Sequence, residues 1–267
     1  RLELPKASLE AVMRACADAS ITFLSTPYGP KDVDLLVELG VPALKTASIH
    51  MAEPTFLAYA ASKGLPMIVS TGMADISEID RGMSAIQAAG GPPVALLQCT
   101  SEYPANSKDA NLKVILNFAN TFDVVPGYSD HTPDYLCAIL SVGFGAKVIE
   151  KHLTLDREAD GPDHAASLDP DGMAQFVANI RAAERALGNG RKEPSDIERQ
   201  NRKTMRRSVF AQQEIVPGSI ISEGMLIFKR PGDGIPVADL ERVLGAIAVE
   251  QIPINTPLRW SQLRLTD

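Results

Sequence analysis

Short apolar runs rich in β-branched residues alternate along this chain with segments of helical periodicity, and this alternation restricts the fold more than any other feature. Six such runs precede residue 153, and they span 21–25, 43–47, 66–70, 94–98, 124–129 and 147–152. Apolar residues recur at helical spacing over 32–39, 76–89 and 176–187. The runs start roughly 20 to 30 residues apart, which fits one strand plus one crossover helix, so the pattern predicts parallel βα units.

Repeated βα units occur both in open doubly wound sheets and in closed (β/α)8 barrels, and the number of units does not distinguish them. The positions of the polar residues distinguish the two folds, because nearly every run ends in a polar cluster, as at Ser25 and Thr26 or at Lys45 and Ser48. A barrel brings all the carboxyl ends of its strands to one mouth, whereas an open sheet brings together mainly those beside its switch point. We therefore predict an α/β fold, a (β/α)8 TIM barrel whose first two βα units are absent from this chain, with 1–19 as the end of the second unit.

The composition changes after Gly190. Residues 191–207 are strongly charged and carry only Ile197 and Met205 as large apolar side chains, which is typical of a linker. Residues 208–267 are rich in Ile, Val, Pro and Gly and contain several turn signals, so they predict a small, mostly β module. The expected organisation is a partial catalytic barrel over 1–190, a linker over 191–207 and the module over 208–267.

Composition excludes several classes of partner. The 267 residues carry a net charge of −7 and no basic stripe, which argues against nucleic acid. No apolar run approaches the roughly 20 residues of a membrane helix. The three cysteines, Cys16, Cys99 and Cys137, lack CxxC spacing, so neither a disulfide framework nor a zinc knuckle is indicated. The expected compartment is a reducing cytoplasm.

Two histidines end consecutive predicted strands, His131 and His152. Neighbouring parallel strands lie about 4.8 Å apart, so both imidazoles can reach one point above the barrel. Two nitrogen ligands without a cysteine fit an open site for Mn²⁺ or Mg²⁺ better than structural zinc. The alternative is that each histidine only forms a hydrogen bond at its strand end.

Lys45 interrupts an apolar strand and needs an anion there, for which a phosphate or carboxylate is suited; the alternative is a lysine that extends from a sheet edge to solvent. Ser48, Ser70, Thr71 and Gly72 supply hydroxyls and a close backbone approach that suit oxyanion recognition, although a plain turn or N-cap has the same pattern.

Three further groups are candidates with an ordinary surface alternative. Asp163 follows the last strand in a polar loop, where a carboxylate can accept hydrogen bonds from sugar hydroxyls or simply belong to a solvated turn. Arg206 and Arg207 end the linker, and Arg230 lies in the small module; all three are equally compatible with solvated surface charge.

The polar strand ends, taken in order, resemble the sialic acid synthase family, which includes N-acetylneuraminate, legionaminate and pseudaminate synthases and spore-coat polysaccharide relatives. The motifs are Phe-Leu-Ser-Thr-Pro-Tyr at 23–28, Lys-Thr-Ala-Ser at 45–48, Ser-Thr-Gly-Met at 70–73, Gln-Cys-Thr-Ser-Glu-Tyr-Pro at 98–104, Tyr-Ser-Asp-His-Thr at 128–132, Ile-Glu-Lys-His-Leu-Thr at 149–154, Gly-Pro-Asp-His at 161–164 and Lys-Arg-Pro-Gly at 229–232. Each motif is weak alone, but eight in the family's order make the resemblance specific.

The resemblance implies a phosphoenolpyruvate-dependent transferase that condenses phosphoenolpyruvate with an N-acylamino sugar, similar to N-acetylmannosamine, and water, giving a nonulosonic acid and phosphate. It implies a TIM barrel followed by an antifreeze-like (SAF) domain that reaches across a homodimer. By the same likeness, Lys45, His131 and His152 are catalytic, the two histidines hold a divalent metal, and substrate is bound by Thr26, Ser48, Ser70, Tyr103, Ser129, Asp163 and Arg230. The alternatives are a phosphoenolpyruvate-dependent sugar-phosphate synthase and an inactive carbohydrate-binding derivative.

Three departures from the family pattern bear on activity and on the sugar. The family's first strand supplies a Glu and an Asn-His pair and its second a further Lys, and no such segment precedes Arg1. Many members have Gly-Ser-Gly-Glu after the lysine, where this chain places His50 at the carboxylate position. Ser101 stands where some N-acetylneuraminate synthases have Asn.

Overall fold

A computed structural model describes residues 4–266. The first residues of the segment 1–19, expected to end the second βα unit, lie outside this range. The chain divides into two compact units, residues 1–189 and 190–267, called here the N-terminal and C-terminal units. No helix among the described residues combines the length and the apolar character needed to cross a membrane.

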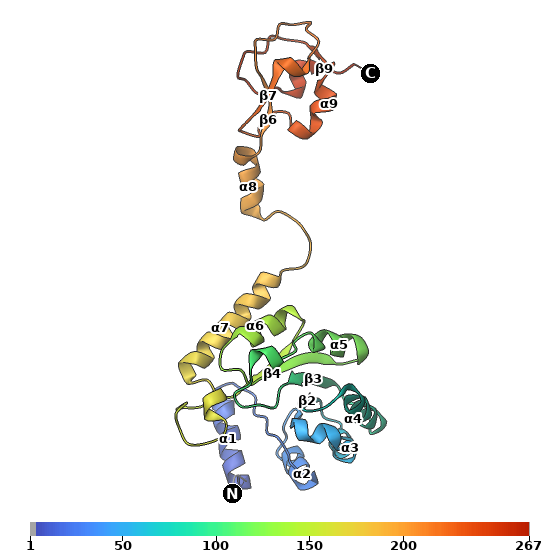
Figure 1. Cartoon of the computed structure of the whole chain (residues 1–267), viewed down its shortest axis with the longest axis vertical. Helices are drawn as coiled ribbons and strands as arrows, with labels where there is room; N and C mark the ends of the chain where they lie inside the picture. The colour runs from blue at the N-terminus through green and yellow to red at the C-terminus, as the bar shows by residue number, and fades with distance from the viewer. Residues whose placement is uncertain (1–3, 267) are drawn as a thin grey trace. The chain divides into compact units, whose positions relative to one another are not determined.

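The N-terminal unit is built on a parallel sheet with the strand order β1-β2-β3-β4-β5. Figure 1 labels β2, β3 and β4 of this sheet. Its strands are β1 (Leu44–Thr46), β2 (Met67–Ser70), β3 (Val94–Cys99), β4 (Val125–Asp130) and β5 (Val148–Lys151). Each strand pairs in parallel with the next in sequence. The prediction of consecutive parallel βα units is thus confirmed for these strands, and the fold is TIM-barrel-like, with the sheet forming a half-barrel.

The sheet is strongly curved, as a contact between its first and last strands shows. In a flat sheet, four strand spacings would separate β1 from β5 by about 19 Å. Lys45 Nζ on β1 nevertheless lies 3.4 Å from Glu150 Oε2 on β5. Side chains of this length meet only if the sheet curls toward its inner face, which is the curvature of a barrel wall.

Helices cover the outer, convex face of this sheet (Figure 1). The helical segments of the unit are α1 (Lys6–Asp18), α2 (Pro30–Glu38), η1 (Ser48–Ala52), α3 (Pro54–Ala61), α4 (Ile76–Ala88), η2 (Ser107–Asp109), α5 (Val114–Thr121), α6 (Leu136–Gly143), η3 (His164–Ala166) and α7 (Pro170–Leu187). The main core lies between α2 to α4 and the outward side chains of β1 to β3, including Leu44, Met67, Val69 and Leu96. A reciprocal capping box between Asp75 and Glu78 fixes the start of α4.

One predicted strand is wrong. Residues 21–25 belong to no strand, and Ile21 is 62% exposed. The Ile21 N–H donates to the carbonyl of Cys16 and so closes the end of α1. A strand requires a neighbour for its backbone groups, and the paired sheet of the described residues begins at β1. Apolar β-branched composition alone therefore misled the prediction here.

The C-terminal unit is a small module with its own core. Its elements are α8 (Asp196–Met205), β6 (Ser208–Ala211), η4 (Glu223–Met225), β7 (Leu226–Lys229), η5 (Val237–Asp239), α9 (Leu240–Val243), β8 (Ile247–Ala248), η6 (Trp260–Gln262) and β9 (Leu263–Arg264). Strands β6 and β7, and β8 and β9, pair antiparallel around buried side chains such as Val209, Ile215 and Ile252. The expected β module is therefore interspersed with short helical turns.

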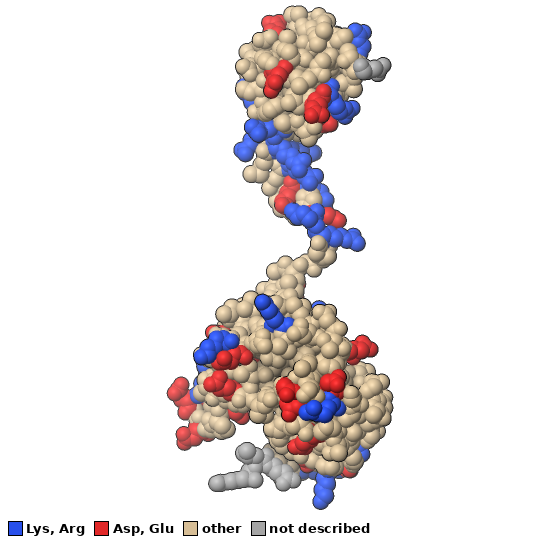
Figure 2. Space-filling view, turned by 45° about the vertical axis from the view of Figure 1, so that its right-hand side comes forward, with Lys and Arg blue, Asp and Glu red and all other residues tan. Residues whose placement is uncertain are grey.

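The charged segment expected as a linker contains a helix. Ser195 and Glu198 form a reciprocal capping box that starts α8, which explains why a polar sequence is helical here. Figure 2 shows Lys and Arg side chains gathered along the segment that carries α8. Residues 199–207 contribute five of these cations and no acid: Arg199, Arg202, Lys203, Arg206 and Arg207.

Candidate active site

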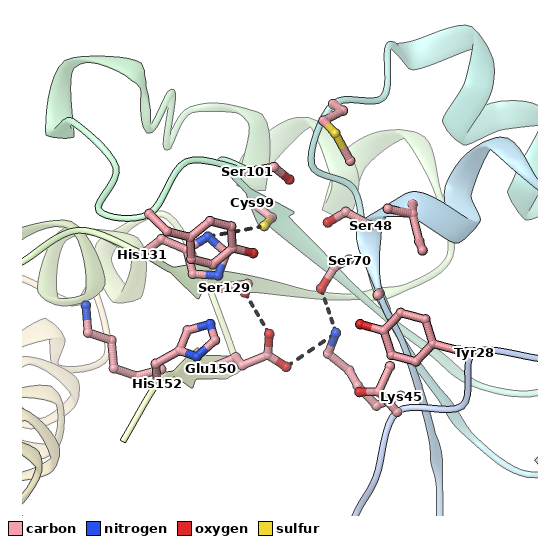
Figure 3. A pocket seen from close by; sticks show the side chains of 16 residues that line it. Tyr28, Lys45, Ser48, Ser70, Cys99, Ser101, Ser129, His131, Glu150 and His152 are labelled. Atoms are coloured by element: carbon pink, nitrogen blue, oxygen red, sulfur yellow. Dashed lines mark hydrogen bonds and ion pairs between the residues drawn. The ribbon is translucent and has the colours of Figure 1, made fainter. Parts of the chain in front are cut away.

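A cavity of about 520 Å³ opens at the carboxyl ends of the strands (Figure 3). This size suits one or two small metabolites. It is lined by eight of the residues predicted for substrate or metal: Thr26, Lys45, Ser48, Ser70, Tyr103, Ser129, His131 and His152. The structure therefore brings together groups that lie as far apart in the sequence as positions 26 and 152.

Strand alternation explains why these side chains share one face. Leu44 and Thr46 of β1 are fully buried on the helix side, so Lys45 between them points inward. The same period of two directs Ser70, Cys99, Ser129 and Glu150 into the cavity from the ends of the next four strands. One inward residue from each of the five strands thus forms a polar layer at the barrel mouth.

Lys45 is the centre of a hydrogen-bonded network. Its ammonium donates to Ser70 Oγ and to the Thr46 carbonyl, each at 2.9 Å, and lies 3.4 Å from Glu150 Oε2. Ser129 Oγ donates to Glu150 Oε1 at 2.7 Å. Lys45 is only 11% exposed, so its charge is compensated by Glu150 within the chain rather than by water. The network presents an ammonium and two hydroxyls to an anionic ligand.

Gly72 lies at a point where three polar side chains converge. Its N–H donates to Ser48 Oγ at 3.0 Å. A Cβ at this position would lie 2.2 Å from Ser101 Oγ, 2.9 Å from Ser48 Oγ and 3.2 Å from Cys99 Sγ. Only glycine leaves this space free, so the predicted close backbone approach is present. The hydroxyl of Thr71, by contrast, donates to the Leu97 carbonyl and is turned toward the backbone.

His131 and His152 lie side by side, with ring centroids 5.2 Å apart. His131 Nδ1 lies 2.7 Å from the carbonyl oxygen of Thr100 and must donate to it, because a carbonyl oxygen only accepts. Nε2 is then the ring nitrogen available to a metal. This arrangement is typical of metal-binding histidines. The described residues contain no cluster of three or more His, Cys, Asp or Glu arranged for a metal. Two imidazoles side by side supply two nitrogen ligands, and water and substrate would have to supply the others of a divalent ion.

Burial shifts the pKa of one member of this pair, His152, and of the neighbouring Tyr103. The pKa of His152 is lowered, first by burial and then by His131, so its imidazole is neutral and able to bind a cation. The Tyr103 ring lies 4.1 Å from that of His131. Burial raises the pKa of Tyr103 to about 12, so its phenol remains a hydrogen-bond donor at neutral pH.

Two predicted site residues are not among the cavity lining. Asp163 lies in the loop before η3 and is exposed; its charge partly opposes the lowering of the His152 pKa by burial and by His131. Arg230 belongs to the C-terminal unit, where it follows β7 and is exposed.

His50 does not take the place of a cavity carboxylate. It is 2% exposed, stacks on Phe56 with ring centroids 4.1 Å apart and places Nδ1 3.2 Å from Glu53 Oε2. Its ring is therefore part of the packing beneath the mouth.

Sequence reasoning gave no role to Glu150, Cys99 or Tyr28, which all line the cavity. The signal for Glu150 was present, because Glu150 and His152 are two residues apart and so share the inward face of β5 and its extension. Tyr28 carried no comparable signal, since it follows an irregular segment.

The comparisons with known proteins agree with this geometry. Residues 1–192 match the NeuB family and residues 206–264 match the SAF domain. The chain is 39% identical over 266 residues to N,N'-diacetyllegionaminic acid synthase of Legionella pneumophila, covering 98% of this chain and 75% of that protein. It is 33% identical over 246 residues to human N-acetylneuraminate-9-phosphate synthase, covering 91% and 68%. A solved N-acetylneuraminic acid synthetase of Leptospira borgpetersenii superposes with a TM-score of 0.70 at 35% identity, over 74% of this chain and 70% of that one.

Proposed function

The chain belongs to the NeuB family, and on that premise we propose that it condenses phosphoenolpyruvate with an N-acylamino sugar, similar to N-acetylmannosamine, and water to give a nonulosonic acid and phosphate. The observation that supports this most is the arrangement of one cavity. The cavity is lined by the Lys45 ammonium and neighbouring hydroxyls, which suit an anion, and by the imidazoles of His131 and His152, which suit a metal.

Lys45 and the hydroxyls of Ser48, Ser70 and Ser129 bind the phosphate and carboxylate of phosphoenolpyruvate through charge-assisted hydrogen bonds in this proposal. Thr26 extends the same group from the segment before α2. An anion that arrives at Lys45 competes with Glu150 for the ammonium, so binding is expected to loosen the Lys45–Glu150 contact.

A carbon–carbon bond forms between the methylene carbon of phosphoenolpyruvate and the aldehyde carbon of the open-chain sugar, and the aldehyde oxygen takes up a proton to become a hydroxyl. Water then adds to C2 and loses one proton. The C2–oxygen bond to phosphate breaks as the new C2 hydroxyl gives up its proton, which leaves the keto group and releases phosphate. His131 and His152 would hold a divalent ion, Mn²⁺ or Mg²⁺, which supplies a Lewis acid toward the sugar's aldehyde oxygen. Glu150 accepts a proton from the attacking water, and the Tyr103 phenol donates a hydrogen bond toward the sugar.

Sugar recognition is assigned to Tyr103, to Asp163 and, from a second copy of the chain, to Arg230. The homodimer with exchanged SAF domains is part of this proposal, as is a cytoplasmic location, where phosphoenolpyruvate is available. A mixed dimer of Arg230→Ala and His131→Ala subunits should regain one intact site. Verified mixed dimers without activity would place Arg230 outside the partner's site.

The direct test is turnover. The chain is incubated with phosphoenolpyruvate, Mn²⁺ and either N-acetylmannosamine, a diacetamido hexose or their 6-phosphates, and 2-keto acid and phosphate are measured together. Equal release of both products with an unphosphorylated acylamino sugar supports the proposal. Turnover restricted to a sugar phosphate would support the alternative sugar-phosphate synthase. Binding of the sugar without release of phosphate would indicate the inactive derivative.

A further inference from the structure

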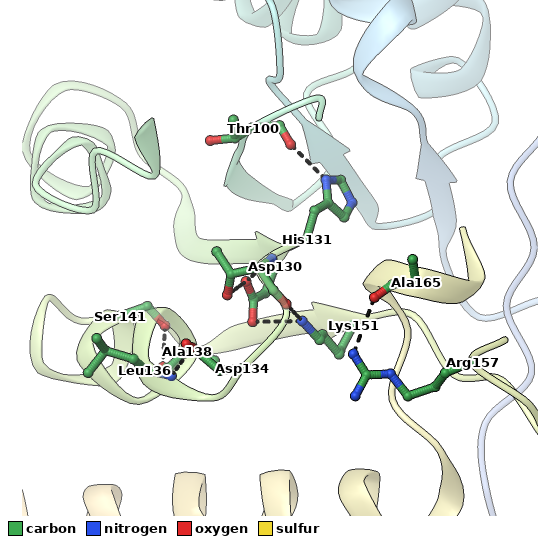
Figure 4. Close-up of polar contacts among 11 residues, drawn as sticks. Thr100, Asp130, His131, Asp134, Leu136, Ala138, Ser141, Lys151, Arg157 and Ala165 are labelled. Carbon is green, nitrogen blue, oxygen red and sulfur yellow. Dashed lines mark hydrogen bonds and ion pairs between the residues drawn. The ribbon is translucent and has the colours of Figure 1, made fainter. Parts of the chain in front are cut away.

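A buried ion pair joins Asp130, which immediately precedes His131, to Lys151, which immediately precedes His152; Figure 4 shows it beside His131. Lys151 Nζ on β5 lies 3.2 Å from Asp130 Oδ2 on β4, and the two side chains are 2% and 0% exposed. A buried ion pair often contributes little net stability, because desolvation offsets the attraction between the charges. Stability alone is therefore a weak explanation for this one.

The ion pair and the histidine pair depend on the same strand register. Asp130 is the cross-strand partner of Lys151 in the parallel pairing of β4 with β5. His131 and His152 are the next residues on each chain segment, so alternation directs them to the opposite face, into the cavity. A slip of one residue between the strands would separate the ion pair and would also move one histidine away from the other.

The same charges also hold the backbone around His131. Asp130 Oδ1 accepts from the Thr132 N–H at 2.9 Å and from the Thr132 hydroxyl at 2.7 Å. Lys151 Nζ donates to the Thr132 carbonyl as well as to Asp130. His131 is thus the middle residue of a turn whose two ends are both bound by the Lys151 ammonium, and Lys151 itself immediately precedes His152.

We propose that Asp130 and Lys151 are positioning residues that fix the separation and orientation of His131 and His152, and thereby the affinity of the site for a divalent metal. This inference rests on the metal site of the proposed function. Lys151 also borders the cavity, but its ammonium is held by Asp130 and by the Thr132 carbonyl. The ion pair therefore acts on the folded site through the two histidine backbones.

The test variant is the double substitution Asp130→Asn/Lys151→Met, which removes both charges together and leaves no buried charge unpaired. Asn keeps an oxygen that can accept from Thr132, and Met keeps most of the lysine's volume. The readouts are the Mn²⁺ Kd of the full chain by titration and the visible absorption of the Co²⁺-loaded protein, together with Tm. We expect the Mn²⁺ Kd to rise about tenfold to a hundredfold, as for other groups that orient metal ligands, and the Co²⁺ spectrum to change.

The matched control is Asp34→Asn/Lys63→Met, which removes a second Asp–Lys pair, 2.6 Å apart, that links α2 to the end of α3 away from the histidines. Its Mn²⁺ Kd should equal that of the wild type. If the test variant does not fold, Thr132→Val provides a milder change, since it removes the hydroxyl bond to Asp130 and leaves both charges in place; it should raise the Kd severalfold.

The outcomes separate this inference from the proposed function. A wild-type chain that binds Mn²⁺ through the histidines, with a test variant of unchanged Kd and Co²⁺ spectrum, would overturn the positioning role alone, whatever its Tm. An equal loss of affinity in the Asp34→Asn/Lys63→Met control would also overturn it, because the effect would then be a general loss of rigidity. A wild-type chain without Mn²⁺ affinity would overturn the metal site and this inference together.

Discussion

Gly72→Ala is expected to damage ligand binding while it leaves the fold nearly intact. The new Cβ would lie 2.2 Å from Ser101 Oγ and 2.9 Å from Ser48 Oγ, and both atoms are ends of short side chains that can rotate. The backbone of Gly72 does not have a positive φ, so alanine is compatible with its conformation. The methyl group would therefore occupy part of the proposed anion site.

The expected changes in Tm and in phosphoenolpyruvate affinity follow from the unliganded protein and the complex, respectively. In the unliganded protein, rotation of Ser48 loses the bond from the Gly72 N–H, at a cost of about 1 kcal/mol. Alanine also lowers the conformational entropy of the unfolded chain, which stabilises the fold by about 0.4 to 1 kcal/mol and offsets much of this cost. Tm should therefore change by no more than about 4 °C. In the complex, the methyl group overpacks the site, which costs about 1 to 3 kcal/mol and corresponds to a roughly 5- to 150-fold weaker Kd for phosphoenolpyruvate.

The assay is calorimetric titration with phosphoenolpyruvate beside a thermal melt, with Gly127→Ala as the control. The Cβ at Gly127 would lie 2.6 Å from the Val148 carbonyl oxygen and 2.2 Å from Leu97 Cδ2, so β4 and β5 must move apart. The Tm of Gly127→Ala should therefore fall further below that of the wild type than the Tm of Gly72→Ala. A Gly72→Ala protein with unchanged phosphoenolpyruvate affinity, or with the larger loss of Tm, would refute the assignment of this space to the ligand.

Three further predictions test other parts of the site and the fold. His131→Ala and His152→Ala should each weaken Mn²⁺ binding by about tenfold or more, measured by elemental analysis after dialysis, and unchanged metal content in both would contradict the metal pair. Lys45→Met should lower kcat/KM for phosphoenolpyruvate by roughly 10- to 150-fold, because one charge-assisted bond is lost; an unaffected kcat/KM would exclude Lys45 from substrate binding. The pKa of Asp75 is lowered from 3.8, first by the Ser77 hydroxyl and then by the Glu78 N–H, so its carboxylate stabilises the fold fully above about pH 3.8 and less as pH falls through the lowered pKa. Asp75→Asn should therefore reduce the pH dependence of unfolding by urea below pH 4, and a pH profile identical to that of the wild type would contradict this.

The sequence determined the parallel βα units, because these depend on local periodicity, and its motifs, through their likeness to a known family, indicated most of the residues that line the cavity. An inward-facing polar residue can be recognised where it interrupts an apolar run, as Lys45 interrupts the run 43–47. The order of strands followed from the connection lengths, since a short crossover helix returns the chain to the adjacent position. Strand-end position therefore indicates that Ser70, His131 and His152 lie at one mouth.

Only the tertiary structure decided which of these groups touch. The curvature of the sheet is a property of several strands together, so the meeting of Lys45 with Glu150 across the half-barrel has no local signature. The segment 21–25 has strand composition but lacks a paired neighbour, and pairing is likewise not a local property. Asp130 and Lys151 are 21 positions apart in the sequence, and their buried contact depends on the register between β4 and β5. Local chemistry thus specified which residues face the cavity, whereas long-range packing specified their partners.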